Sequence, residues 1–231
     1  MMDKSKRIEF IVSNLEKVTT LADIGTDHGY VPLLALRNEL CEKAIACDIN
    51  KDPLAKGKLN AILEGIDDKI EFRLGNGFEP LNINEVEEVV IAGMGGNLIR
   101  DIIQKDLNKA ASCNYLVLIP AQNPEVLREY LYKNDFEIIT EDLCFDEGIY
   151  YELFKVRKAE GQAIELDSIY YEISPMLLRS KHPLMKNYID YKINEYNKIL
   201  GFITDESPSA LKRKAEVSEK IEILNRMKNY L

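Results

Sequence analysis

The sequence predicts an α/β fold in which a mostly parallel sheet ends in an antiparallel hairpin and is followed by a small α-helical hairpin or coiled coil. Three observations predict it. Over the first two thirds of the 231 residues, short apolar runs alternate with amphipathic stretches, which is typical of consecutive βαβ units. The last two apolar runs have no helix between them. From about residue 159 only two long helical patterns remain, so we expect one domain over residues 1–158 and another over 159–231.

The apolar runs of the first domain predict its strands in chain order. Five runs predict parallel strands, at residues 21–25, 43–48, 70–74, 86–92 and 115–119. Helices are predicted to alternate with them, at residues 31–38, 52–65, from 96 onwards, and 124–133. The helix over 52–65 begins with Asp52-Pro53 and stops at Gly65, and its apolar residues lie on one face: Leu54, Ala55, Leu59, Ile62 and Leu63. Residues 136–143 and 149–156 predict the closing hairpin.

The loop after the first strand has the residues of a nucleotide-binding turn. It reads Asp23-Ile24-Gly25-Thr26-Asp27-His28-Gly29. Gly25 lets the strand turn sharply, and Gly29 lets backbone N–H groups at the helix start face a bound polar group. Asp48 follows Gly25 by 23 residues, ends the second strand, and is placed to accept hydrogen bonds from ribose hydroxyls. This spacing alone suits NAD and S-adenosylmethionine equally.

Three details favour S-adenosylmethionine. The loop lacks the G-x-G-x-x-G arrangement and has Asp27 in place of the middle glycine, a charge that repels a diphosphate and can pair with a sulfonium. Asn76-Gly77-Phe78 ends the third strand, where the amide can read the adenine edge and the ring can cover its face. The closing hairpin is typical of a methyltransferase domain. In the alternative interpretation, Asp27 and His28 only cap the helix and complete the turn.

A second glycine loop, Gly93-Met94-Gly95-Gly96, follows the fourth strand at the expected topological switch point. Glycines there allow a substrate base and the transferred methyl group to approach closely. The loop has no Asn/Asp-Pro-Pro-Tyr/Phe sequence, which argues against an exocyclic amine as methyl acceptor. A tight connection without a ligand is the alternative.

With these loops the sequence resembles the bacterial tRNA (adenine-22-N1)-methyltransferase family, TrmK, of class I methyltransferases with a Rossmann-like sheet. The resemblance rests on Lys6-Arg7, Leu131-Tyr132-Lys133 and two strings, Asp23 to Pro32 and Ile91-Ala92-Gly93-Met94-Gly95-Gly96. The chain departs from the family in Asn76-Gly77, where Asp-Gly is usual, and in Asp48, where Glu is usual; both keep a hydrogen-bond acceptor. The sequence and the resemblance together imply that the following residues contact S-adenosylmethionine: Arg7, Asp23, Gly25, His28, Gly29, Asp48, Ile49, Asn76, Gly77, Gly93 and Met94.

The implied reaction is in-line methyl transfer to adenine N1, whose lone pair needs no prior deprotonation. Asp27 is expected to stabilise the positive charge that reaches the ring, with Tyr30 or Asn123 orienting the base. Gln122 and Asn123 are alternatives for the position that faces the base. Because N1 lies on the pairing edge, the target adenine must be unpaired or flipped out.

The tail from residue 159 is expected to bind tRNA. Its two apolar stripes run from Met185 to Leu200 and from Leu211 to Leu231, with a turn over 201–208, and predict two helices that pack on each other. Residues 161–231 carry a net charge of +1, although the whole chain carries −9. We expect phosphate contacts from the basic residues of the tail, such as Arg179, Lys181, Lys186, Lys212, Arg213 and Lys214.

Other classes of protein are disfavoured by composition. No apolar run approaches the ~20 residues of a membrane span and no signal-peptide core is present, so we expect a soluble, cytoplasmic protein. We also expect a monomer. The four cysteines lie far apart and the only histidines are His28 and His182, so no metal site is expected and the cysteines are interpreted as core or boundary residues. Two alternatives remain open: an NAD-dependent oxidoreductase, and a non-catalytic RNA-binding module with a vestigial pocket.

Overall fold

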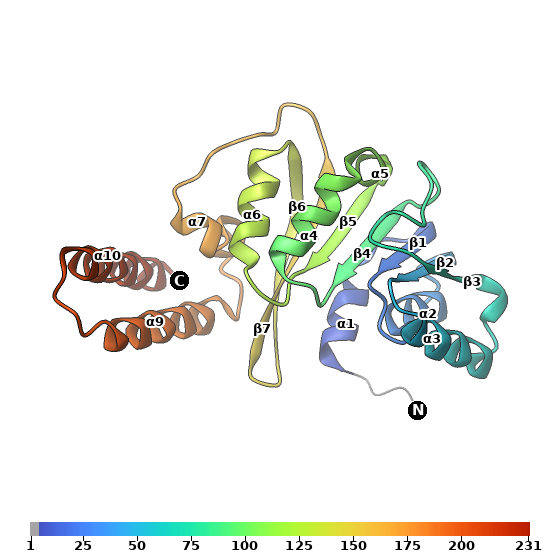
Figure 1. The fold of residues 1–231 in the computed structure, drawn as a ribbon, viewed down its shortest axis with the longest axis horizontal. Coiled ribbons are helices and arrows are strands. Elements are labelled where there is room, and N and C mark those ends of the chain that lie inside the picture. The colour runs from blue at the N-terminus through green and yellow to red at the C-terminus, as the bar shows by residue number, and fades with distance from the viewer. Residues whose placement is uncertain (1–4) are drawn as a thin grey trace. The chain divides into compact units, whose positions relative to one another are not determined.

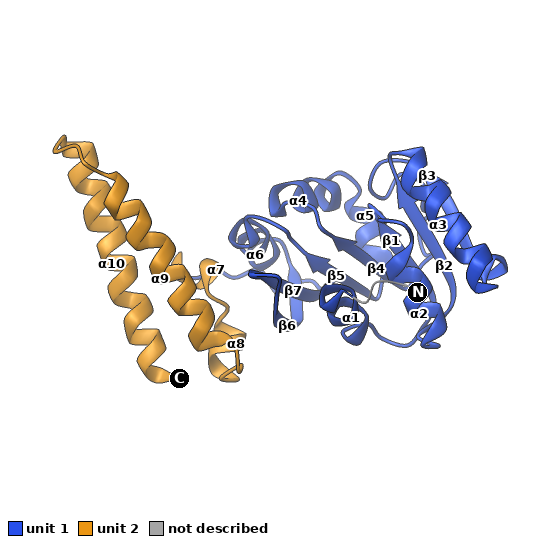
Figure 2. Ribbon diagram, turned by 90° about the horizontal axis from the view of Figure 1, so that it is seen from below, with its two compact units in different colours: residues 1–166 blue, residues 167–231 orange. Residues whose placement is uncertain are grey.

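The computed structural model describes residues 5–231, which form two compact units that divide between Leu166 and Asp167 (Figure 2). The predicted boundary after residue 158 is the end of the last strand, but the following segment stays with the first unit. The amide of Ile164 donates to the carbonyl of Tyr132 at 2.8 Å, and the amide of Gln162 donates to the Asp135 carboxylate at 3.1 Å. These bonds hold the segment against the sheet domain.

The first unit contains a seven-stranded sheet of order β3-β2-β1-β4-β5-β7-β6 (Figure 1). Its strands are β1 (Val18–Ile24), β2 (Cys41–Asp48), β3 (Ile70–Leu74), β4 (Glu88–Ala92), β5 (Tyr115–Ile119), β6 (Phe136–Asp146) and β7 (Ile149–Lys158). The first five are parallel, and β7 runs antiparallel between β5 and β6. The prediction of a parallel sheet closed by a hairpin is confirmed, and chain order reverses between β1 and β4.

Helices cover both faces of this sheet, and each face has its own apolar core. The helices are α1 (Lys6–Ser13), α2 (Tyr30–Arg37), α3 (Lys51–Glu64), α4 (Gly96–Lys105), α5 (Leu107–Ser112) and α6 (Pro124–Lys133), with a 3₁₀ turn η1 at Asp67–Lys69. Apolar residues of α1, α2 and α3 pack on one face, and those of α4, α5 and α6 pack on the other. Adjacent residues of a strand alternate between the cores, as Val89 and Val90 do in β4, because side chains of a strand point to opposite faces.

The predicted apolar face of α3 is wrong. Of its five residues only Leu54 is buried, and Leu59, Ile62 and Leu63 are exposed. The helix packs instead through small residues, including Gly57. A Cβ atom added at Gly57 would lie 2.6 Å from the Phe72 ring and 3.2 Å from the carbonyl carbon of His28. A close approach to the β1–α2 turn therefore selects this face, although the larger apolar side chains lie elsewhere on the helix.

Cysteines behave as the sequence predicts. Cys41, Cys47 and Cys113 are buried, Cys144 is partly buried, and all four are free thiols. Burial raises the pKa of the Cys41, Cys47 and Cys113 thiols to about 12, so they stay protonated and act as small apolar residues.

The second unit is helical throughout its regular structure and contains α7 (Ile169–Glu172), α8 (Pro175–Arg179), α9 (Met185–Phe202) and α10 (Pro208–Tyr230). The two long helices contact each other, as the stripes predict. Val217 and Leu224 of α10 are buried, whereas Leu211 of the predicted stripe is exposed. At the side of this pair, the Glu172 carboxylate accepts from the Tyr196 hydroxyl and pairs with Lys220.

Candidate functional site

A cavity of about 560 Å³ opens at the carboxyl ends of β1, β2, β3 and β4. This is the place in an open parallel sheet where ligands bind, and the volume lies within the usual ~300–1,000 Å³ of small-molecule sites. Nine of the residues predicted to form the site line it: Arg7, Gly25, Asp27, Asp48, Ile49, Asn76, Gly77, Gly93 and Met94. They come from α1 and four separate loops, so the fold brings together what the sequence holds far apart.

Gly25, at the end of β1, contributes to the lining of the cavity. Gly25 adopts a positive φ of 78°, and its amide donates to the carbonyl of Cys47 at 2.8 Å, so β1 ends in a turn fastened to β2. A Cβ atom at Gly25 would lie 2.1 Å from the terminal carbon of Met94. The positive φ requires glycine for the turn, whereas the flexible Met94 side chain could rotate away from a larger residue.

Three carboxyl groups lie at this end of the sheet. Asp23 is buried beneath the loop, and burial raises its pKa to about 6, with the charges of Asp27 and Asp48 adding to the effect. Asp48 accepts the amide of Asn50 at 2.6 Å and lines the cavity. Asp27 also lines it with a side chain that is 76% exposed. Among residues 5–231, Arg7 is the one cationic side chain that lines the cavity, whereas two carboxylates, Asp27 and Asp48, line it. This excess of negative charge disfavours a diphosphate ligand.

His28 and Tyr30 form a polar cluster next to Asp27. Nδ1 of His28 lies 3.3 Å from the Tyr30 hydroxyl, and Nε2 lies 3.5 Å from Asp27 Oδ1 and 3.4 Å from Lys56 Nζ. Neither residue lines the main cavity, and Tyr30 lines a second cavity of about 530 Å³ between α1 and α2. Gly29, with φ 72°, is the residue that precedes α2, and no side chain caps that helix end. The capping role that was the alternative for Asp27 and His28 is therefore absent.

The loop after β4 is joined to the loop after β5. The Met94 carbonyl accepts from the amide of Ala121 at 2.8 Å, and the Gln122 carbonyl accepts from the amide of Gly96 at 2.7 Å. Asn123 has φ 52° and precedes α6. Gln122 and Asn123 are both exposed and neither lines the cavity, so the structure does not choose between them as the residue that faces the base.

The predicted role of Phe78 is wrong. Its ring is fully buried in the core on the α4 side of the sheet, so it cannot cover an adenine in the cavity. Leu98 and Ile102 of α4 line the cavity, and Leu98 is 51% exposed. In the sequence these two residues have the spacing of an ordinary apolar helix face. Their spacing carried no sign that this side extends past the core to the site.

The match to a family model decides the identity. The model for TrmK, tRNA (adenine(22)-N(1))-methyltransferase, matches residues 21–226. The chain belongs to this family. Its activity is S-adenosylmethionine-dependent methylation of adenine N1 at position 22 of tRNA, which confirms the predicted enzyme class and cofactor and removes the oxidoreductase and the non-catalytic RNA-binding module.

Relatives of the TrmK family agree in sequence and fold. The chain is 31% identical over 159 residues to the tRNA (adenine(22)-N(1))-methyltransferase of Bacillus subtilis, covering 69% of this chain and 67% of that protein. The crystal structure of B. subtilis TrmK superposes with a TM-score of 0.85 at 26% identity, covering 99% of this chain and 100% of that one. Streptococcus pneumoniae Sp1610 in complex with S-adenosyl-L-methionine gives 0.85 at 25% identity, covering 97% and 99%.

Residues 5–231 contain no group of three or more His, Cys, Asp or Glu side chains arranged to hold a metal ion. Within the same residues no helix is long and apolar enough to cross a membrane.

Proposed function

We propose that the cavity at the ends of β1–β4 holds the methyl donor of this TrmK enzyme. Most of its lining residues would contact the cofactor, and Asp27 would act on the substrate base. The observation that carries the proposal is the convergence of nine predicted residues, from α1 and four loops, on one cavity. The remaining predicted residues, Asp23, His28, Gly29, Tyr30 and Asn123, do not line it, and we give them supporting or substrate-side roles.

The lining residues fit S-adenosylmethionine. The Asp48 carboxylate is suited to accept hydrogen bonds from the ribose hydroxyls, and the Asn76 amide is suited to form hydrogen bonds with the edge of the adenine. Ile49 and Leu98 are exposed apolar side chains that can cover the adenine faces in place of Phe78. Arg7 is suited to pair with the carboxylate of the methionine part. The bound cofactor supplies an electrophilic methyl group on a sulfonium.

The residues around Asp27 would serve the substrate base. Adenine N1 carries a lone pair, so the chain has no proton to remove before attack. The Asp27 carboxylate would stabilise the positive charge that the adenine ring gains, through electrostatic attraction and acceptance from the exocyclic amine. The Tyr30 hydroxyl, held by His28 at 3.3 Å, would orient the base, and the exposed Gln122 or Asn123 would contact it from the β5 side. Close approach of the base is possible at Gly93, where no atom lies within 4 Å of an added Cβ.

The decisive experiment is mass spectrometry of tRNA nucleosides after incubation with S-adenosylmethionine, with the position mapped by reverse-transcription stops. We expect 1-methyladenosine at position 22. Asp27→Asn should lower kcat by about 10- to 100-fold and leave the KM for S-adenosylmethionine within about threefold, since its charge acts on the base. Asp52→Asn, an exposed change on α3, is the control. Unchanged kcat in the Asp27 variant would contradict the assigned role.

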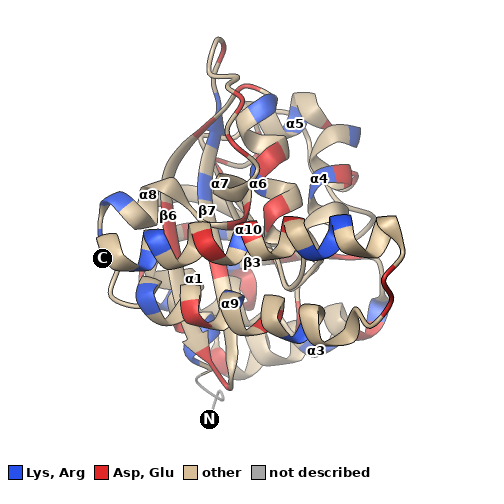
Figure 3. Cartoon of the chain, turned by 90° about the vertical axis from the view of Figure 1, so that its left-hand side faces the viewer, with Lys and Arg blue, Asp and Glu red and all other residues tan. Residues whose placement is uncertain are grey.

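We assign tRNA backbone contacts to the helical unit. Figure 3 shows Lys and Arg interspersed with Asp and Glu along α9 and α10. Because the net charge of residues 161–231 is only +1, binding of the tRNA backbone would depend on local groups of Lys and Arg. Lys212, Arg213 and Lys214 are three consecutive basic residues near the start of α10. Changing all three to Glu should weaken tRNA binding and reduce its salt dependence, with S-adenosylmethionine binding unchanged. Unchanged tRNA affinity would exclude this contact.

A monomeric state and a cytoplasmic location stay predictions. Sedimentation equilibrium of the full chain tests the first, and cell fractionation tests the second.

A further inference from the structure

Residues 75–87 connect β3 to β4 as a 13-residue loop without helix or strand. The loop begins with Gly75, Asn76 and Gly77, all of which line the cavity. Such a loop loses conformational entropy when it is held in one shape, so something must hold it if the adenine side of the cavity is to be formed before the cofactor arrives.

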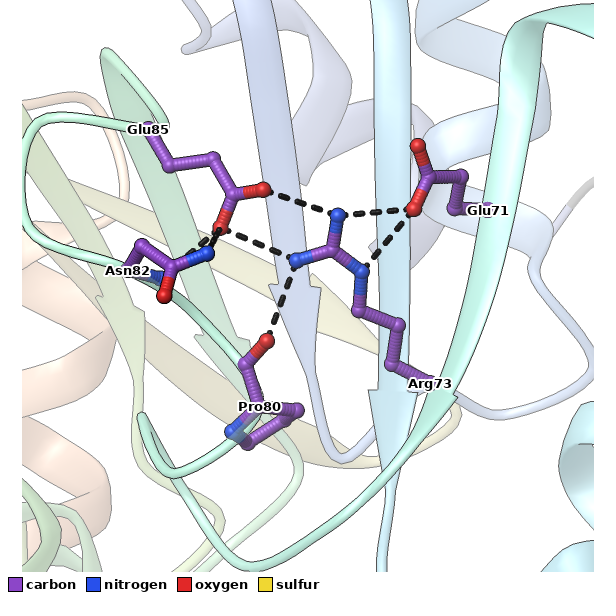
Figure 4. A network of polar contacts seen from close by, with 5 residues as sticks. All are labelled: Glu71, Arg73, Pro80, Asn82 and Glu85. Carbon is purple, nitrogen blue, oxygen red and sulfur yellow. Dashed lines mark hydrogen bonds and ion pairs between the residues drawn. The ribbon is translucent and has the colours of Figure 1, made fainter.

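Arg73 of β3, the edge strand of the sheet, contacts this loop at two separate points (Figure 4). Its Nη1 and Nη2 donate to the two carboxylate oxygens of Glu85, at 2.9 and 2.8 Å. Nη1 also donates to the carbonyl oxygen of Pro80, at 3.0 Å. The guanidinium holds the pKa of Glu85 below its usual range, so the carboxylate stays ionised and the pair stays charged. One planar group thereby joins the strand to the middle and the end of the loop.

Pro80 packs against a residue that lines the cavity, Gly75. A Cβ atom added at Gly75 would lie 2.9 Å from Cδ and 3.1 Å from Cγ of Pro80, so the proline ring packs against the Gly75 backbone. Next in the chain, the amide of Asn76 donates to the Glu79 carboxylate at 3.2 Å, and the Glu79 amide donates to the Asn76 carbonyl at 3.1 Å. Displacement of Pro80 would therefore move Gly75 and Asn76, both of which line the cavity.

We propose that Arg73 is a positioning residue for cofactor binding, which holds the loop over residues 75–87 in the shape that places Asn76 and Gly77 in the cavity. The inference rests on the proposed function, because it assumes that the cavity binds S-adenosylmethionine. Arg73 does not line the cavity, so it acts through the loop. Arginine suits the task, because only its fork can serve both oxygens of Glu85 and the carbonyl together.

The chain offers a matched control. Glu71 also accepts from Arg73, at 3.0 Å from Nε and 2.7 Å from Nη2, but it lies on the same strand and is 68% exposed. Glu71 touches Arg73 without joining it to the loop. Glu71→Gln should therefore leave cofactor affinity within about twofold of wild type, because exposed ion pairs contribute little.

The test compares the full-length variants Arg73→Gln, Arg73→Lys, Glu85→Gln and Glu71→Gln by calorimetry with S-adenosylhomocysteine and by steady-state methylation of tRNA. We expect the first three to raise the Kd for S-adenosylhomocysteine and the KM for S-adenosylmethionine by roughly 5- to 20-fold. The kcat at saturating cofactor and the KM for tRNA should stay within about twofold. The double variant Arg73→Gln with Glu85→Gln should bind no more weakly than Arg73→Gln alone, because the two residues act as one unit.

Other outcomes separate the inference from the proposed function. If wild-type protein binds neither S-adenosylmethionine nor S-adenosylhomocysteine, the proposed function is wrong and the inference falls with it. If wild type binds and Arg73→Gln binds equally well, only the inference is wrong. A lower kcat and a lower melting temperature with unchanged KM would show a general structural role and overturn it. Full affinity in Arg73→Lys would show that charge alone suffices, and would overturn the role of the fork.

Discussion

Gly96, the first residue of α4, offers a sharp test of how the loops after β4 and β5 are joined. A Cβ atom at this position would lie 2.2 Å from the carbonyl oxygen of Asn123 and 3.1 Å from its carbonyl carbon. Both are backbone atoms, so no side chain can rotate away. Gly96→Ala must push the two loops apart and stretch the 2.7 Å hydrogen bond from the Gly96 amide to the Gln122 carbonyl.

The cost can be worked from these contacts. Forcing an extra carbon into a packed position costs about 1–3 kcal/mol. Loss of the hydrogen bond adds about 1 kcal/mol. We therefore expect Gly96→Ala to lower the free energy of unfolding by about 2–4 kcal/mol. Because Met94 lies in the displaced loop and lines the cavity, affinity for S-adenosylmethionine should fall as well.

Gly95→Ala is the matched control. Gly95 has φ −69° and ψ 149°, which alanine adopts readily, and no atom lies within 4 Å of an added Cβ. Gly95 is the N-cap of α4, where alanine is less favourable than glycine, so the unfolding free energy should fall by no more than about 1 kcal/mol. Urea unfolding followed by circular dichroism measures both variants. Equal stability of the two variants would refute the close approach of the two loops and the reasoning built on it.

Three further predictions concern buried or lining charges. Asp48→Asn should weaken S-adenosylmethionine binding by roughly 10- to 100-fold in calorimetry, through loss of charged hydrogen bonds, and unchanged affinity would remove Asp48 from the site. Burial raises the pKa of Glu88 to about 7 from 4.5. Its protonated form therefore stabilises the fold at low pH, and this contribution is lost as pH rises through 7. Relative to Glu88→Gln, wild type should lose up to about 3 kcal/mol of unfolding free energy between pH 5 and 8, and parallel pH curves would contradict this. Arg128 is fully buried between two buried glutamates, so Arg128→Met should cost about 3–5 kcal/mol in urea unfolding. Arg157→Met, at a half-exposed pair, should cost under about 1 kcal/mol, and a similar cost for both would refute the argument from burial.

The strands illustrate what local patterning can establish. The run over 115–119 matches β5 at both ends, because a buried parallel strand is continuously apolar and bounded by polar turns. The run over 70–74 also matches β3 at both ends, and there apolar residues alternate with Glu71 and Arg73, as suits a strand at the edge of the sheet. The closing hairpin is also predicted correctly, because two strands joined by only a short turn can pair with each other only in the antiparallel direction. Its strands extend further than the apolar pattern, to Asp146 and Lys158, because backbone pairing in β6 and β7 continues where side chains are polar.

Phe78 and Leu98 illustrate what local patterning cannot establish. Both are apolar residues near glycine loops, but Phe78 lies wholly in the core and Leu98 lines the cavity. Which of them meets solvent depends on how the loop after β3 packs on the core, and that path is set by contacts between distant segments. The exposed apolar residues of α3 have the same origin, because the approach of Gly57 to the β1–α2 turn fixes the rotation of the helix.

By itself the sequence determined the order of the strands and of the longer helices between them, the glycine turns and the chemical character of the site, but not the short helices α5, α7 and α8. Each of these depends on residues close together in the chain: periodic burial, positive φ at Gly25, and an acid at the end of a strand. Only the tertiary structure decided which side chains share the cavity, that Tyr30 faces a second one, and that Arg73 reaches across to Pro80 and Glu85. Those outcomes depend on close packing between segments far apart in the chain, where a single methyl group decides whether two backbones can meet.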